Sequence, residues 1–528
     1  MIKYPCEYFG FRKEQRAALC GRKRAPWVLA ATIIGSGMAF IDSTVVNVAL
    51  PALQADLHAT VIDVQWVIAA YALFLSALLL VGGALGDQFG RRRVYAIGLV
   101  LFMSASVWCG LAPTVTQLII ARAAQGVGGA LLVPGSLAII TVSFSEGERA
   151  KAIGTWSGFS AMTTALGPLL GGWLIDHASW RWVFYINIPI GLIGLFILFT
   201  FVSESRDEKG TAKLDKWGAL FAILGLGGIV YGLIESPILG FGHPLVIGAI
   251  SGGVIALIAF LYVEKYASAP MMPLTLFHSR SFSGANILTF FLYAALGGVL
   301  FFVPFNLIQV QGYSAFAAGA AFLPLIVLIF FLSRWAGTLV DRYGAKRPLI
   351  VGSGIATIGF ALLAVPDMDT SYWTGFFPAF VILGFGLAVT VTPLTTLVMG
   401  AVEESRAGIA SGINNALSRT AGLLAIAVFG IFALNSFNRG LDVRLTEINV
   451  PPKVVQALDE QRFRLAAAEI PVNIDKQQRI ALRNAIDESF IDSFRLLMII
   501  ATALAFISWI TAILTIEGQQ SKARTQLM

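Results

Sequence analysis

The chain has 528 residues, of which 57% are hydrophobic and only 13% are charged, and its mean hydropathy is +0.78. No soluble domain of this length needs so much apolar surface, so the composition predicts an all-α integral membrane protein. The formal net charge of +7 does not indicate a nucleic-acid partner, because the basic residues are spread along one predicted side of the membrane.

Apolar runs of about 20 residues or more recur along the chain, and each is long enough to cross a hydrocarbon core of about 30 Å. They predict fourteen transmembrane helices, at 27–50, 64–85, 94–112, 115–143, 152–176, 182–202, 217–236, 244–265, 284–310, 317–340, 348–366, 374–398, 408–435 and 492–516. Lys and Arg concentrate in residues 1–26 and in the loops on the same side, whereas the short opposite loops hold Arg181 alone. This bias predicts a multi-pass protein of the inner cell membrane with both termini in the cytoplasm.

Asp42 is a charged residue within the first predicted span, and Arg122 lies within the fourth. Counting about 1.5 Å per residue places Asp42 roughly 12 Å and Arg122 roughly 10 Å from the outer ends of their spans, so the two can meet. A carboxylate in hydrocarbon costs several kcal/mol when it is unpaired, which indicates a functional reason for its presence. Two interpretations stay open: a static ion pair that joins the two spans, and a proton-coupling pair.

A short charged loop occurs twice in the chain. The segment GALGDQFGRRR at 83–93 returns as GTLVDRYGAKR at 337–347, with five identical positions at an offset of 254 residues. Two copies at a fixed offset predict two pseudo-symmetric six-helix bundles, the architecture of many secondary transporters. The candidate gating residues in these loops are Gly83, Asp87, Gly90, Arg91, Gly337, Asp341, Gly344 and Arg347.

The fifth predicted span carries two pairs of glycines spaced four residues apart, Gly154 with Gly158 and Gly167 with Gly171. This spacing puts small residues on one helix face and predicts close packing against a partner helix. Pro168 adds a point at which the helix can bend.

The repeat offset exceeds the length of a six-helix unit, so two helices are predicted to be inserted between the bundles. Glu235 lies near the outer end of this pair, where an interface carboxylate in contact with water is the simpler interpretation and a second titratable site is the alternative. The predicted organisation is a basic cytoplasmic N-terminus at 1–26, an N-terminal six-helix bundle at 27–202, an inserted segment with flanking cytoplasmic loops at 203–283, a C-terminal six-helix bundle at 284–516 and a cytoplasmic tail at 517–528.

The C-terminal bundle includes a long outer loop at 436–491. Apolar residues at helical spacing over 454–468 and 474–486 predict short amphipathic helices there. We expect a surface-lying hairpin or a partial cap over the outer mouth, and a dedicated partner-binding domain stays open as an alternative. The protein is expected to be a monomer in contact with membrane lipid, and a periplasmic adaptor is left open as a partner.

The predicted substrate cavity is apolar and aromatic with scattered amides, a lining that suits amphipathic or cationic organic compounds. Arg419, about 17 Å into the thirteenth span, is expected in its cytoplasmic half. The candidate cavity residues are Asn47, Gln125, Trp156, Met162, Phe290, Tyr293, Phe305, Asn306, Gln309, Asn414, Asn415 and Arg419.

Several segments carry a family resemblance that covers essentially the whole chain. LIIARAAQGVGGALLVP at 118–134 is similar to the fourth-helix Arg motif of the major facilitator superfamily, and GFSAMTTALGPLLGG at 158–172 to its fifth-helix antiporter motif. IDSTVVNVALP at 41–51 and SWRWVFYINIPIG at 179–191 resemble signatures of its 14-span branch. The chain therefore resembles the 14-span drug:proton antiporters of the multidrug efflux type.

This resemblance implies that Arg122 takes part in proton transfer and that Asp87, with Arg91, latches the inner gate in the outward-open state. It also implies that the fifth-span motif marks an antiporter; the motif residues are Gly158, Gly167, Pro168, Gly171 and Gly172.

The expected function is the proton-coupled export of small organic compounds and drugs by alternating access, with the proton gradient as energy source and no cofactor. An exporter or flippase of a native lipid, siderophore or metabolite is the first alternative, and a non-transporting membrane sensor or scaffold is the second. The chain is not expected to be an enzyme, because it has no phosphate-binding GxxxxGK[S/T] motif and its four histidines fall in loops or at span ends.

Overall fold

The computed structural model describes residues 13–206, 215–267, 270–368, 370–402, 407–448, 450–471 and 474–517, and these ranges contain helices and no β-strand. The elements are α1 Lys13–Asp56, α2 Val61–Phe89, α3 Arg91–Leu111, α4 Val115–Ser143, α5 Glu146–His177, α6 Trp182–Tyr185, α7 Asn187–Phe201, α8 Lys216–Leu239, α9 Pro244–Tyr266, η2 Leu274–His278, α10 Arg280–Phe305, η3 Asn306–Val310, α11 Ala315–Ala320, α12 Leu323–Tyr343, α13 Lys346–Leu362, α14 Phe376–Gly400, α15 Ala407–Ile448, α16 Pro452–Asp459, η5 Arg462–Ala467 and α17 Lys476–Thr515.

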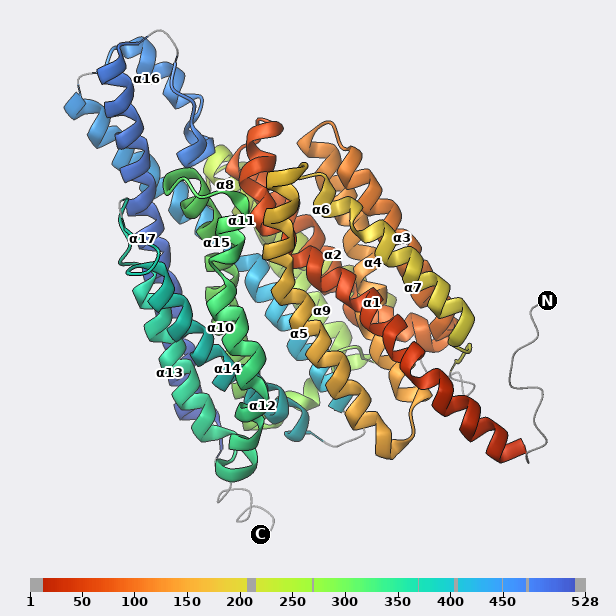
Figure 1. Ribbon diagram of the computed structural model, residues 1–528. Coiled ribbons are helices and arrows are strands. Elements are labelled where there is room, and N and C mark those ends of the chain that lie inside the picture. The colour runs from red at the N-terminus through yellow and green to blue at the C-terminus, as the bar shows by residue number, and fades with distance from the viewer. Residues whose placement is uncertain are drawn as a thin grey trace.

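Thirteen helical segments of the described chain are long and apolar enough to cross a membrane, one fewer than the sequence predicts. The segment that falls short is α13, which has 17 residues. It nevertheless packs against α14 and α17 within the C-terminal bundle. Helix α1 begins and α17 ends on the same face of the molecule, at the bottom of Figure 1.

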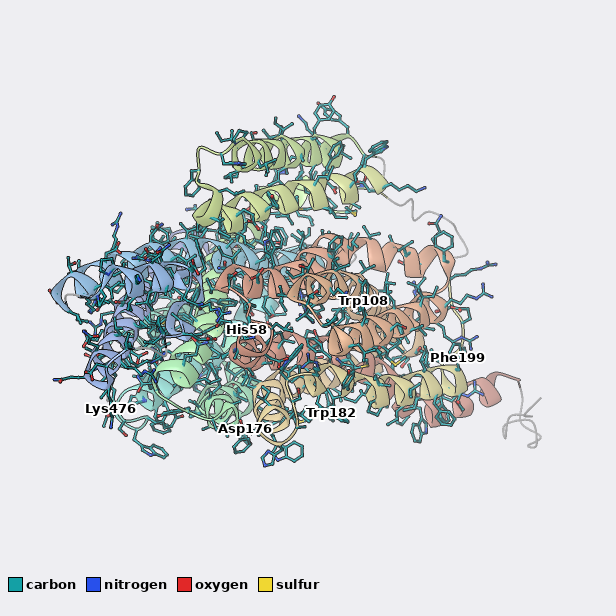
Figure 2. All side chains as sticks on the ribbon, turned by 90° about the horizontal axis from the view of Figure 1, so that it is seen from above. His58, Trp108, Asp176, Trp182, Phe199 and Lys476 are labelled. Carbon is teal, nitrogen blue, oxygen red and sulfur yellow. The ribbon has the colours of Figure 1, made fainter. Side chains whose placement is uncertain are left out.

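The helices form the two six-helix bundles that the repeat predicts. Helices α1 to α7 make the N-terminal bundle, and α10 to α15 with α17 make the C-terminal bundle. We call the face where α1 begins the terminal face and the opposite face, which carries α16, the loop face (Figure 1). The inserted helices α8 and α9 pack on each other and lie to one side of the main body, with α8 against α2 and α15 (Figure 2).

The repeated loop has the same backbone turn in both copies. Helix α2 starts with a reciprocal cap, in which the Thr60 hydroxyl accepts from the backbone N–H of Asp63 at 3.1 Å and the Asp63 carboxylate accepts from the N–H of Thr60 at 2.8 Å. In the first copy of the loop, α2 ends at Gly90, where φ is +106°. In the second copy, α12 ends at the equivalent Gly344, where φ is +72°. Only glycine adopts this conformation readily, so the two repeated glycines stop their helices in the same way.

The long outer loop is more helical than the sequence predicts. The prediction of a separate helix over 474–486 is wrong, because α17 begins at Lys476 and runs on without a break into the last span. Helix α15 likewise continues to Ile448, so the two helices protrude together beyond the loop face (Figure 1). Arg444 of α15 joins them through ion pairs with Glu488 at 2.9 Å and Asp492 at 2.7 Å. The unbroken 3.6-residue periodicity and these ion pairs explain the extension.

The segment between the protruding helices caps the N-terminal bundle, as the partial-cap prediction requires. In η5, the carbonyl oxygen of Arg464 accepts from Gln54 Nε2 at 3.3 Å, and the Arg464 guanidinium donates to the carbonyl oxygen of His58 at 3.2 Å. Both partners lie where α1 ends on the loop face. The segment therefore bridges the two bundles.

The two bundles are closed against each other at the loop face. The carboxylate of Asp176, near the end of α5, accepts from the backbone N–H groups of Ala315 at 3.1 Å and Phe316 at 2.9 Å, the first residues of α11. A side chain at Gly172 would overlap the carbonyl oxygen of Ala315, so α5 and α11 touch backbone to backbone. Gln65 of α2 donates across the seam to the carbonyl oxygen of Ile426 at 2.7 Å.

The same helix α5 is open toward the terminal face. Gly167 and Gly171 pack closely on α1, as predicted, and Gly171 would bring a Cβ to 2.6 Å from Val45 Cγ2. The packing prediction is wrong for Gly154 and Gly158, which are exposed and have nothing within 4 Å of the Cβ position. The bundles thus meet at the loop face, while this half of α5 stands free.

Replacing Gly172 with leucine is expected to open the loop face, because the new side chain would occupy the space of the α11 backbone. An overpacked contact costs about 1–3 kcal/mol, which corresponds to a population change of about 5- to 150-fold. The measurement is the rate at which a membrane-impermeant maleimide labels a Gln54→Cys reporter, buried beneath the cap, after the native cysteines are replaced by alanine.

The matched control is Gly248→Leu on α9, where nothing lies within 4 Å of the Cβ position and the labelling rate should not change. Equal labelling rates in the two leucine variants would contradict closure of the loop face by α5 and α11.

Candidate functional site

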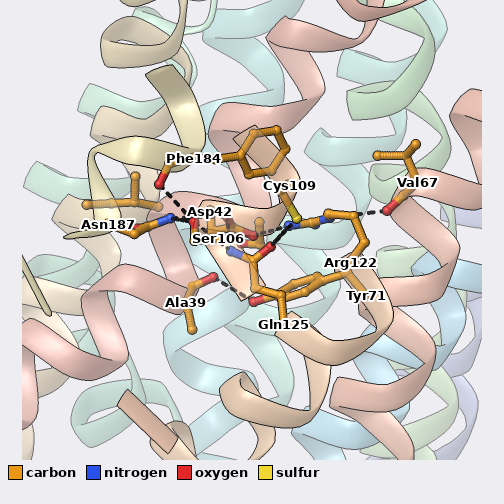
Figure 3. A network of polar contacts seen from close by, with 12 residues as sticks. Ala39, Asp42, Val67, Tyr71, Ser106, Cys109, Arg122, Gln125, Phe184 and Asn187 are labelled. Atoms are coloured by element: carbon orange, nitrogen blue, oxygen red, sulfur yellow. Dashed lines mark hydrogen bonds and ion pairs between the residues drawn. The ribbon is translucent and has the colours of Figure 1, made fainter. Parts of the chain in front are cut away.

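The centre of the N-terminal bundle holds a buried ion pair. Asp42 projects from α1 and Arg122 from α4, and neither residue has any exposed surface. Arg122 Nη1 donates to Asp42 Oδ2 at 2.5 Å (Figure 3). The depth estimate from the sequence is therefore confirmed, because the two side chains meet inside the bundle.

Three further polar side chains hold this pair in place. Gln125 donates from Nε2 to Asp42 Oδ1 at 2.8 Å and accepts from Arg122 Nη1 at 2.7 Å, so it bridges the two charges. Asn187, at the start of α7, donates to Asp42 Oδ1 at 3.4 Å and to Ser106 Oγ at 3.0 Å. Ser106 donates in turn to the carbonyl oxygen of Phe184 at 2.8 Å (Figure 3). The carboxylate thus receives donors from α4 and α7.

The Arg122 guanidinium also contacts α2. Its Nε donates to the carbonyl oxygen of Val67 at 3.2 Å, and its Cζ lies 4.1 Å from the centre of the Tyr71 ring. The Tyr71 hydroxyl donates to the carbonyl oxygen of Ala39 on α1 at 3.2 Å. One guanidinium nitrogen, Nη2, is buried without a hydrogen-bond partner in the described chain. A buried guanidinium with one unbonded nitrogen has fewer hydrogen bonds to break when it changes partners than a fully bonded guanidinium.

Gln125 is not a cavity residue, and that prediction is wrong. It has no exposed surface, and both ends of its amide are used within the ion-pair network. Its position three residues after Arg122 puts both on the same face of α4, a signal that was present in the sequence. Ser106 and Asn187 were missed, although a single polar residue in an apolar span is the ordinary sign of such a partner.

The cavity residues of the N-terminal bundle lie along α1 and α5. Trp156 donates from Nε1 to Ser36 Oγ at 2.8 Å, and its ring meets Phe40 edge to face at 6.2 Å. Asn47 is half-buried and donates to the carbonyl oxygen of Ser43 at 3.5 Å, and Met162 is half-buried on α5.

The cavity residues of the C-terminal bundle divide into two groups. Phe290, Tyr293, Asn414 and Arg419 are half-buried and Asn415 is exposed, all on α10 and α15, which pack together. Asn414 donates to Thr289 Oγ1 at 2.7 Å and to Asn286 Oδ1 at 3.1 Å, both on α10.

The second group does not line an open space, which corrects the prediction for Phe305, Asn306 and Gln309. Phe305 and Asn306 are each only 1% exposed, where α10 passes into the π-turn η3, and Phe305 packs on Phe301. Gln309 donates to Gln54 Oε1 at 2.9 Å and so contributes to closure at the loop face.

The first gating loop is engaged within its own bundle. Asp87 pairs with Arg91 at 2.6 Å. The carboxylate of Glu204, which follows α7, accepts from the backbone N–H groups of Arg92 at 3.0 Å and Arg93 at 3.2 Å. This carboxylate at the N-terminus of α3 is stabilised by the helix dipole. A Cβ at Gly83 would lie 3.6 Å from Pro134, so the loop packs closely on α4.

The second gating loop has no such carboxylate cap among its described contacts. Gly337 would place a Cβ 3.8 Å from Thr392 Cγ2 on α14, and Arg347 is exposed. The side chain of Asp341 lies outside the described residues.

Glu235 faces the N-terminal bundle rather than open water. It is half-buried on α8, and its Oε1 accepts from Trp66 Nε1 of α2 at 2.8 Å. This bond anchors the inserted pair to α2.

Comparison with known proteins identifies relatives over most of the chain. A family model described as the Major Facilitator Superfamily matches residues 32–426. The tetracenomycin C resistance and export protein of Streptomyces glaucescens is 31% identical over 508 residues, which cover 94% of this chain and 93% of the relative. The multidrug resistance protein Stp of Mycobacterium tuberculosis is 34% identical over 485 residues, which cover 90% of this chain and 89% of the relative.

Solved structures share the fold. A bacterial homologue of the human lysosomal transporter Spinster, inward-facing and unoccupied, matches with a TM-score of 0.60 at 19% identity, over 94% of this chain and 99% of that chain. The xylose transporter XylE from E. coli matches with a TM-score of 0.58 at 14% identity, over 94% of this chain and 99% of that chain.

Removal of one partner of the buried pair is expected to destabilise the protein strongly. Arg122→Met leaves Asp42 buried without its countercharge, a loss that typically costs about 3–5 kcal/mol. The double variant Asp42→Asn with Arg122→Met should cost less than the two single changes together, because no charge then stays buried. The measurement is the free energy of unfolding from SDS titration in mixed micelles for all four proteins of the cycle. Additive losses would contradict direct pairing.

Proposed function

The chain belongs to the Major Facilitator Superfamily, and from this premise we propose that it is a proton-coupled exporter of organic compounds. Relatives of similar length are named as drug resistance or export proteins, among them those for tetracenomycin C and puromycin. The observation that carries the proposal is the Asp42–Arg122 pair, because it puts a titratable carboxyl group inside a transporter bundle.

The pair is suited to exchange a proton as the carrier changes state. Arg122, Gln125 and Asn187 all donate to the Asp42 carboxylate, so a proton that binds there replaces the contact with Arg122. In the state described here the carboxylate is fully buried and bonded. A proton that arrives from the loop face would release Arg122, and its departure toward the terminal face would restore the pair.

The direction of transport follows from the membrane orientation. The Lys and Arg bias assigns the terminal face to the cytoplasm and the loop face to the outside of the inner membrane. Protons then run inward down their gradient while the organic substrate is carried out. The protein works as a monomer without a cofactor in this scheme, since the two bundles of one chain supply both gates.

Asp42→Asn is expected to abolish uphill transport while the protein still folds, because asparagine keeps the hydrogen-bonding shape but cannot exchange a proton. In proteoliposomes with an imposed pH gradient, each coupled proton should support about a tenfold substrate gradient per pH unit in the unaltered protein. The variant should only equilibrate the substrate across the membrane. The measurement is the steady-state accumulation of a transported dye.

Glu235→Gln is the matched carboxylate-to-amide control, because the glutamine oxygen can still accept the hydrogen bond from Trp66. It should keep full accumulation. Gradient-driven accumulation by Asp42→Asn would overturn the assignment of the coupling site, and movement of lipid analogues alone would favour a flippase.

A further inference from the structure

A second arginine lies at the junction of the two bundles without a countercharge. Arg419 projects from α15, is half-buried, and makes no hydrogen bond or ion pair in the described chain. Its contact with a neighbouring group is with the Phe40 ring on α1, whose centre lies 5.8 Å from the guanidinium carbon. Arg122 instead bonds to a carboxylate, an amide and a carbonyl.

The charge of Arg419 is not neutralised by an ion pair within the described chain. A cation within a membrane span costs several kcal/mol unless it is paired or hydrated. The described chain places no carboxylate within ion-pair distance of Arg419, whereas it pairs Arg122 with Asp42. The residue is therefore held ready for an anion that the described chain does not provide.

The surroundings of Arg419 suit a flat aromatic body. Phe40 belongs to α1 of the N-terminal bundle and Arg419 to α15 of the C-terminal bundle, so the guanidinium and the ring meet across the junction of the two bundles. Phe40 also meets the Trp156 ring edge to face. Asn415, one helical turn before Arg419, is exposed on the same face of α15 and adds an amide.

We propose that Arg419 is the anion-recognising residue of the transport site, and that the exporter prefers planar aromatic compounds that carry a carboxylate or an equivalent oxyanion. The guanidinium would bind the oxyanion while the neighbouring aromatic rings enclose the apolar body. This inference rests on the proposed export function and narrows its substrates. It replaces the expectation of cationic compounds, because the described residues at this junction offer a cation and no carboxylate.

The test uses two dyes that differ in a single group. Rhodamine 110 has a free carboxylate, and rhodamine 123 is its methyl ester on the same xanthene ring system. In proteoliposomes with an imposed pH gradient, the apparent KM of the unaltered protein for rhodamine 110 should be lower by about tenfold or more, as expected for a charge-assisted hydrogen bond in a site shielded from water. Equal KM values for the two dyes would overturn the proposal without any variant.

Arg419→Gln should remove this difference by raising KM for rhodamine 110, and Arg419→Lys should keep part of it because the charge remains. Arg495→Gln is the control, since Arg495 pairs with Asp367 and Asp492 away from the junction, and it should leave the ratio of KM values as it is. A role in folding alone would lower transport of both dyes equally in Arg419→Gln, and this result would also overturn the proposal.

Failure of the proposed function gives a different result. If neither dye responds to the pH gradient in the unaltered protein, the export function itself is wrong. If rhodamine 123 is driven by the gradient at least as well as rhodamine 110, export stands and anion recognition by Arg419 is wrong.

Discussion

The cost of a charge in hydrocarbon determines how the polar residues of this protein are placed. Asp42 and Arg122 are tolerated at the centre of a bundle because each satisfies the other and because Gln125 and Asn187 complete the carboxylate's bonds. Acids nearer the ends of the spans are used differently. Asp176 binds the first N–H groups of a helix from the opposite bundle.

Close backbone contact is the second constraint, and it determines which state the protein adopts. At Gly172 the absence of a side chain lets α5 reach the backbone of α11, and the Asp176 carboxylate then caps that helix. Near the terminal face the same helix has Gly154 and Gly158 unpacked. The Asp87 carboxylate at that end pairs with Arg91 in its own loop instead of binding across the seam. The loop face is thus closed by contacts between the two bundles, and the described glycines Gly154 and Gly158 make no such contacts near the terminal face.

The features that depend on helix length and on the repeated loop could be predicted from the sequence. The rise per residue was enough to bring Asp42 and Arg122 to one depth, and the repeat was enough to predict two bundles with the same glycine turn at Gly90 and Gly344. The rotation of a helix about its axis was not predictable in the same way, because tertiary packing decides it. For this reason Phe305 was expected in a cavity although it is buried in the C-terminal bundle.

The prediction of close packing at Gly158 was wrong for a different reason. Its spacing is the same as that of Gly167, but a carrier brings different faces together in its two states, and sequence spacing does not say which state is observed. Only Gly167 lies in the half of α5 that is packed here.

Helix α2 contacts both the buried ion pair and the seam between the two bundles. Its Gln65 reaches across the seam to α15, its Val67 carbonyl accepts from Arg122, and the ring of its Tyr71 lies against the Arg122 guanidinium. The Tyr71 hydroxyl in turn donates to the carbonyl oxygen of Ala39 on α1. The part of α2 that contacts Arg122 therefore also carries the contact across the seam to α15. Because packed helices shift as rigid bodies, a displacement of α2 would move its contacts with the ion pair and its contact across the seam together.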